Sequence, residues 1–172
     1  TTTTYQVTAT IGGCSTTDQV LVKTVPYPGS AAGPDTTLCY NTQGFLHGRI
    51  NGSRFVWSPA VYLGNPNSLN TSVNPPRTTA FVLAAYDTLG CPKPKYDTLI
   101  VTVLPRIRPF AGRDTVVIIG QPLRFNASGG TSYQWVPGTW LNDPRIPNPT
   151  GVYDGSVDSV RYKLVVSDQA GC

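Results

Sequence analysis

The stretch Phe55-Val56-Trp57-Ser58-Pro59 recurs 78 positions later as Tyr133-Gln134-Trp135-Val136-Pro137. Ahead of it, Ala32-Gly33-Pro34-Asp35-Thr36 recurs 79 positions later as Ala111-Gly112-Arg113-Asp114-Thr115. Landmarks that keep their order and spacing indicate an internal repeat, here of about 79 residues.

The end of the repeat is present three times, and each copy closes on Gly-Cys, at Cys14, Cys91 and Cys172. This pattern predicts three segments: 1–25 as the C-terminal strands of a preceding repeat, 26–105 as a complete repeat, and 106–172 as a repeat without its last strand. Short Pro-rich linkers are expected where the segments meet, because Pro stiffens the chain.

Composition and periodicity predict an all-β fold. The 172-residue chain has no Met and no Glu, and it is rich in the strand formers Thr, Val and Tyr. Alternation of apolar and polar residues predicts a strand with one buried face over 5–11. The other strands are expected at 20–25, 99–104, 116–119 and 162–166. Each unit is therefore interpreted as a β-sandwich of short strands.

Four aromatic residues are the predicted core anchors. Trp57 and Trp135 occupy the same place in the repeat, as do Phe81 and Tyr162. A large aromatic could also line a ligand groove, but a repeated position favours the core.

The cysteines predict a disulfide and an oxidising compartment. Pairing Cys39 with Cys91 would close a loop of about 50 residues. In the chain-entropy model this would stabilise the folded state by on the order of 4 kcal/mol, and a disulfide implies an oxidising compartment. Trp57 lies between them, as in the Cys…Trp…Cys order of immunoglobulin domains. The third repeat has Ile118 where Cys39 would be, so Cys172 has no obvious partner in its unit, and the partner of Cys14 is open.

Several motifs together resemble the PKD-like and immunoglobulin-like tandem repeats of very large Bacteroidota surface proteins. The motifs are Ala-Gly-x-Asp-Thr, Trp57-Ser58-Pro59, Leu63-Gly64-Asn65-Pro66, Leu141-Asn142-Asp143-Pro144 and Asp-x-x-Gly-Cys at 87–91 and 168–172. Such proteins are often exported by the type IX secretion system and carry a gliding-motility-associated sorting domain. The resemblance implies that the chain is part of a stalk, spacer, adhesin shaft or filament body. It also implies that its partners are neighbouring repeats or other copies.

The residue types give no support for catalysis. His47 is the single His, and no nucleophile motif, phosphate-binding loop or Cys/His cluster accompanies it. No enzyme activity, cofactor or metal centre is therefore predicted. The basic residues Arg106, Arg108 and Arg113 lack interleaved aromatics, so a nucleic-acid partner is not expected. No apolar run is long enough for a membrane span.

Aspartates that recur suggest two further hypotheses. Asp35 and Asp114 are calcium candidates, but each is isolated, and an Asp that caps a turn is the alternative. Asp-Thr and Asp-Ser pairs resemble the O-glycosylation motif of Bacteroidota secreted proteins. The candidate sites are Thr36, Thr88, Thr98, Thr115 and Ser159.

The sequence therefore predicts a non-catalytic, extracellular or cell-surface module with a structural or adhesive role. The alternative is an accessory module of a large secreted enzyme, binding polysaccharide through exposed aromatics. The candidates for such a row are Tyr40, Tyr62, Tyr86 and Tyr153.

Overall fold

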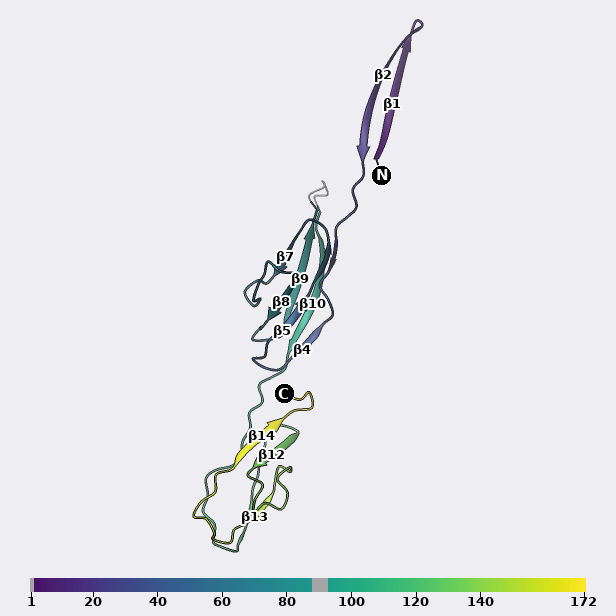
Figure 1. Cartoon of the computed structure of the whole chain (residues 1–172). Helices are drawn as coiled ribbons and strands as arrows, with labels where there is room; N and C mark the ends of the chain where they lie inside the picture. The colour runs from purple at the N-terminus through teal and green to yellow at the C-terminus, as the bar shows by residue number, and fades with distance from the viewer. Residues whose placement is uncertain (1, 88–92) are drawn as a thin grey trace. The chain divides into compact units, whose positions relative to one another are not determined.

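The computed structural model describes residues 2–87 and 93–172, and every regular element within them is a β-strand (Figure 1). The chain divides into two compact units, Thr1–Leu104 and Pro105–Cys172. Each unit is described by itself below. Among the described residues there is no helix that could cross a membrane.

The first unit begins with a long antiparallel hairpin. Strands β1 (Thr2–Ile11) and β2 (Cys14–Lys23) pair along their whole length, and Gly12 and Gly13 make the turn at positive φ. The strand predicted over 5–11 forms, but the prediction that one of its faces is buried was wrong. Every residue of both strands is exposed, because the described residues place no second layer on either face.

A four-stranded sheet forms one layer of the sandwich in the first unit. Its order is β4 (Thr36–Leu38), β10 (Lys95–Val103), β9 (Thr79–Tyr86) and β7 (Arg54–Ser58). Strand β4 runs parallel to β10, whereas the other neighbours are antiparallel.

The opposite layer consists of two short pairs. Strand β3 (Gly29–Ala31) pairs with β6 (Arg49–Asn51), and β5 (Gly44–His47) pairs with β8 (Asn70–Val73). Gly48 separates β5 from β6. A Cβ at Gly48 would lie 2.7 Å from the Trp57 ring, so the close approach of backbone and indole requires glycine there.

The two layers enclose one apolar core. Trp57 (2% exposed), Phe81 (0%) and Leu83 (0%) contribute from the four-stranded sheet, and Leu46 and Val73 contribute from the opposite pair. Alternation along the strands produces this division: in β9, Phe81, Leu83 and Ala85 are buried, whereas Val82 between the first two is half-buried.

This strand order is that of an immunoglobulin-type sandwich. The segment β5–β6 takes the place of strand B, and β7, β8, β9 and β10 take those of C, E, F and G. B pairs with E, whereas C, F and G share the other sheet. The buried Trp57 on strand C is a further hallmark of that architecture.

The second unit has fewer strands. Strand β11 (Pro122–Arg124) pairs with β13 (Thr150–Val152), and β12 (Ser132–Val136) pairs with β14 (Lys163–Ser167). These are the B–E and C–F pairs of the first unit. Trp57 faces Leu83 across β7 and β9, and Trp135 faces Leu164 across β12 and β14.

An aromatic cluster forms the core of the second unit. The Phe125 ring lies 5.0 Å from that of Trp135 and 5.3 Å from that of Tyr162, measured between centroids. Trp135 is 1% exposed, whereas Tyr162 is half-buried and donates from its hydroxyl to the Thr139 carbonyl at 2.9 Å. Burial and the neighbouring Tyr153 hydroxyl raise the pKa of Tyr162 above its ordinary value of 10.0.

The strand predicted over 116–119 does not form. Val116 is 97% exposed, Ile118 76% and Ile119 66%. Its counterpart in the first unit, β4, is held by parallel pairing with β10. Residues 105–172, all of which the structure describes, contain no strand in the place of β10, so this segment has no partner to pair with.

Candidate interaction surfaces

One face of the hairpin is apolar and uncovered. The cross-strand pairs Tyr5–Val20 and Thr3–Val22 put alternate residues of both strands on a single face. Five large apolar side chains lie on that face with exposures of 43–85%: Tyr5, Val7, Ile11, Val20 and Val22. The other face carries mostly Thr and Gln. Asp18 lies opposite Val7 on the same face, so the apolar side chains are interrupted by a charge.

The same face is buried in the complete sandwich. Tyr5 opposite Val20 corresponds to Phe81 opposite Leu99, and Thr3 opposite Val22 corresponds to Thr79 opposite Val101. Phe81, Leu99 and Val101 are 0%, 1% and 0% exposed. The hairpin therefore shares its register and the spacing of its apolar residues with the β9–β10 pair.

A second surface is the open edge of strand β14. In the first unit, β9 is paired on both sides, with β7 and β10. Within residues 105–172, β14 is paired only with β12. In residues 105–172, no strand lies beside its N–H and C=O groups on the other side.

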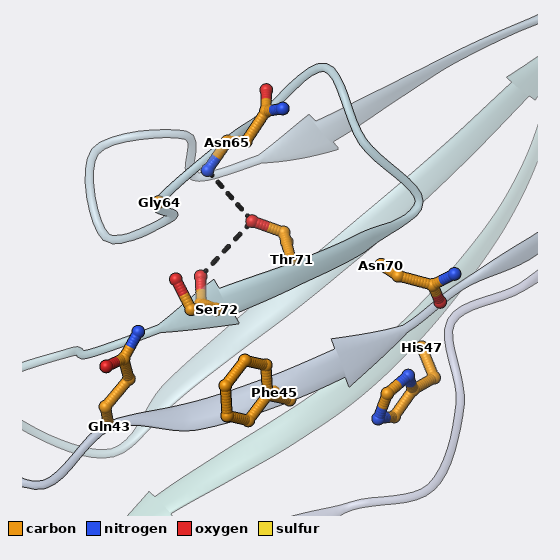
Figure 2. A pocket seen from close by; sticks show the side chains of 8 residues that line it. All are labelled: Gln43, Phe45, His47, Gly64, Asn65, Asn70, Thr71 and Ser72. Atoms are coloured by element: carbon orange, nitrogen blue, oxygen red, sulfur yellow. Dashed lines mark hydrogen bonds between the residues drawn. The ribbon is translucent and has the colours of Figure 1, made fainter.

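A shallow groove of about 480 Å³ lies on the outer face of the β5–β8 pair (Figure 2). The side chains that line it include Gln43, Phe45, His47, Asn65, Asn70 and Ser72. Phe45 is 65% exposed and stands on the same strand as His47. The groove floor is fixed by Thr71, whose hydroxyl accepts the Asn65 N–H at 2.9 Å and donates to the Ser72 carbonyl at 3.3 Å.

The lining of this groove contains one titratable side chain. His47 is the one titratable side chain among its lining residues, and the others offer amides, hydroxyls and one phenyl ring. No carboxylate or thiol lines it that could act with the imidazole as a second catalytic group.

The aspartates proposed for calcium have different surroundings. The Asp35 carboxylate accepts the Ile100 N–H at 2.8 Å, so it caps the parallel β4–β10 junction. Asp114 is exposed. Among the described residues, no group of three or more His, Cys, Asp or Glu side chains could hold a metal.

Four of the candidate glycosylation residues lie in the described part of the chain. Thr98, Thr115 and Ser159 are exposed, and Thr36 is half-buried in β4. Thr88 lies outside the described residues.

Cys39 and Cys172 are each disulfide-bonded, whereas Cys14 is free and exposed. The presence of disulfide bonding agrees with the sequence analysis. Cys91 lies outside the described residues. Because Cys14 is free, the predicted Cys39–Cys91 pairing does not account for the bonded state of Cys172, and peptide mapping has to decide it.

The four tyrosines proposed as a sugar-binding row are not alike. Tyr40 is 48% exposed, but Tyr62 packs against the core and Tyr86 lies under the Arg54 guanidinium, 4.5 Å from its ring centroid. Tyr153 is half-buried beside Trp140, with 6.2 Å between ring centroids. Sequence reasoning missed several exposed rings, among them Phe45. Its signal was available, since Phe45 alternates with the buried Gly44 and Leu46.

The strand order of the first unit is that of the class of immunoglobulin-type β-sandwiches. No family model matches the chain, and no curated protein matches it. Among solved structures, the crystal structure of Dpr2 Ig1-Ig2 in complex with DIP-Theta Ig1-Ig3 is similar, with a TM-score of 0.41 and 14% identity. The match covers 95% of this chain and 67% of that chain. The assignment to this class is therefore based on the strand order alone.

Proposed function

We propose that this chain is a non-catalytic, extracellular structural or adhesive module made of tandem immunoglobulin-type repeats. The observation that carries the proposal is that the same strand pairings occur within each of the two units. Ala31 opposite Arg49 corresponds to Phe110 opposite Ser128, and the two Trp–Leu pairs across strands C and F also correspond. Modules that repeat in series build extended shafts, in which each repeat supports its neighbours.

The same reasoning supports the division into 1–25, 26–105 and 106–172. The hairpin has the register of the F–G pair, residues 26–105 contain every strand of a sandwich, and 106–172 contain the B–E and C–F pairs. The resemblance to the repeats of large Bacteroidota surface proteins fits a stalk, adhesin shaft or filament body. Its partners would then be neighbouring repeats or other copies.

Disulfide bonding supports an extracellular location, because such bonds persist in oxidising compartments. The test is labelling of intact cells that produce the protein with an antibody against residues 26–104. We expect labelling before permeabilisation, and loss of cell attachment or of surface filaments when the coding segment is deleted. Labelling only after permeabilisation would overturn the proposal.

The groove around Phe45 favours a second candidate function, binding of a polysaccharide. Sugars stack on flat apolar rings, and the neighbouring amides of Gln43, Asn65 and Asn70 can hydrogen-bond to hydroxyls. A glycan array should then give hits that Phe45→Ala abolishes and that Val56→Ala, a change at another exposed strand residue, leaves intact. An array without hits would remove this candidate.

A further inference from the structure

We infer that the hydroxyl of Tyr162 selects the left-handed backbone conformation of Trp140, and so decides which of two forms the turn over 138–141 adopts. The turn is closed by a hydrogen bond of 3.3 Å from the Leu141 N–H to the Gly138 carbonyl. Trp140 is its third residue and has a φ of 64°. This turn lies within the second unit, and its conformation does not depend on the proposed function.

A positive φ is unusual for a side chain as bulky as that of Trp140. In a four-residue turn, the third residue has a positive φ in type II and a negative φ in type I. Type II therefore favours Gly or Asn at the third place, and a tryptophan there carries a steric cost. Another interaction in the second unit has to compensate for that cost.

The first unit contains the same turn without the left-handed residue. The Leu63 N–H donates to the Ala60 carbonyl at 3.1 Å, which corresponds to the closing bond of the second unit. Tyr62 is the third residue of this turn, in the place of Trp140, and it does not have a positive φ. An aromatic residue at this place therefore does not by itself produce the left-handed form.

A hydrogen bond from Tyr162 supplies the difference. Its hydroxyl donates to the Thr139 carbonyl at 2.9 Å, and Thr139 is the second residue of the turn. A change from type II to type I reverses the peptide between the second and third residues, so that this carbonyl points to the opposite side. The bond is therefore available only to the left-handed form. The residue in the place of Tyr162 in the first unit is Phe81, which has no hydroxyl to donate.

The left-handed turn also positions the indole of Trp140. Its ring centroid lies 6.2 Å from that of Tyr153, and its side chain hydrogen-bonds to the Asp154 carboxylate. The Tyr153 hydroxyl donates to the Tyr162 hydroxyl at 3.4 Å. The strained residue thus belongs to a closed set of contacts that begins and ends at Tyr162. In the first unit the corresponding pair is Pro75-Pro76, which has no side-chain hydrogen-bonding group.

The experiment measures nuclear Overhauser effects between backbone protons in the full chain and in Tyr162→Phe. In type II the Hα of the second residue lies close to the N–H of the third, whereas in type I the two N–H groups lie close together. We expect a strong signal from the Thr139 Hα to the Trp140 N–H in the parent chain. In Tyr162→Phe the signal between the two N–H groups should replace it. Phe81 has the corresponding place in the first unit, so we expect this variant to fold.

The matched control is Tyr153→Phe. It also removes one hydroxyl from the cluster, but it leaves the bond from Tyr162 to Thr139 in place, so the turn should stay left-handed. Unchanged turn signals in Tyr162→Phe would overturn the inference, and so would a reversed turn in Tyr153→Phe. A second readout is hydrogen exchange of the Trp140 indole N–H, which should accelerate about fivefold or more in Tyr162→Phe alone, because the indole leaves Asp154. Equal exchange in the two variants would contradict the positioning of the indole.

Discussion

The carboxylate of Asp35 accepts a hydrogen bond of 2.8 Å from the backbone N–H of Ile100, 65 positions away in the sequence. The bond joins the residue before β4 to the middle of β10, beside the parallel pairing that starts at Thr36 and Val101. An Asp that recurs in the repeat thus has a structural role in the first unit. This bond reaches a distant strand, so it differs from the local turn cap that was the alternative to a calcium ligand.

Replacement of Asp35 by Ala should weaken this junction. Loss of one hydrogen bond costs about 1 kcal/mol, so exchange of the Ile100 amide should accelerate about fivefold. The matched control is Asp114→Ala, at the exposed corresponding position, where no strand like β10 is present in the second unit. If added Ca²⁺ protected Ile100 in the parent chain and not in Asp35→Ala, Asp35 would act as a calcium ligand and not only through its bond to Ile100.

Trp57 should dominate the stability of the first unit. Its side chain is 2% exposed in the core, and truncation of a buried large aromatic to Ala costs about 3–5 kcal/mol. Denaturant unfolding, with hydrogen exchange of β7 and β9 to assign the transition, measures the loss. Val56→Ala, at the 46% exposed neighbour, should cost far less. Equal costs for the two variants would contradict the core assignment.

Replacement by Phe should destabilise the protein to different extents at the two tryptophans. Trp135 Nε1 donates to the Ile146 carbonyl at 3.1 Å, whereas the buried Trp57 Nε1 has no hydrogen-bond partner in the described residues. Trp135→Phe leaves a carbonyl without its donor, so it should cost about 1–3 kcal/mol more than Trp57→Phe does. The comparison is made on the unfolding free energy of each variant's own unit. The reverse order would refute it.

Asp154 should titrate below its ordinary pKa. The Ser156 hydroxyl donates to its carboxylate at 2.6 Å and the Ser156 N–H at 2.9 Å, and these bonds lower the pKa from 3.8. A depressed folded-state pKa means that the ionised form supports the loop above pH 3.8, and that this support is lost as the pH falls through the lower value.

A carboxyl NMR titration measures the pKa of Asp154 directly. Ser156→Ala should raise it toward 3.8, because the larger of the two causes is removed. A pKa of Asp154 that does not change in this variant would show that the hydroxyl is not the cause.

The cysteine pairing is decided by peptide mapping without reduction. The sequence predicts a peptide that joins Cys39 to Cys91, and Cys14 should react with a thiol reagent in the folded chain. A peptide that joins Cys39 to Cys172, the other bonded cysteine, would overturn the predicted pairing. Free thiols at Cys39 would remove the support for an oxidising compartment.

Much of the fold could be read from the repeat and from alternation. The β-class, the strands at 5–11 and 162–166 and the place of Trp57 follow from residue type and period, which are local properties. The exposure of Tyr5 and the loss of the 116–119 strand could not be read in this way. Each depends on whether a distant strand is present to pair or to pack, and alternation reports only that a face is apolar. The groove at Phe45 depends on two strands and a loop that are brought together by the fold.

The parallel pairing of β4 and β10 has a mechanical consequence. Strand β4 lies near the start of the sandwich and β10 at its end, and they run in the same direction. A stretching force applied between β4 and β10 pulls the two strands in opposite directions along their length. The hydrogen bonds between the two strands then bear the force together, in shear, instead of breaking one after another. They include the backbone bond from the Leu104 N–H to the Leu38 carbonyl, 2.9 Å long, and the bond from the Ile100 N–H to the Asp35 carboxylate. A sandwich closed in this way resists extension when its first and last strands are pulled apart along their length.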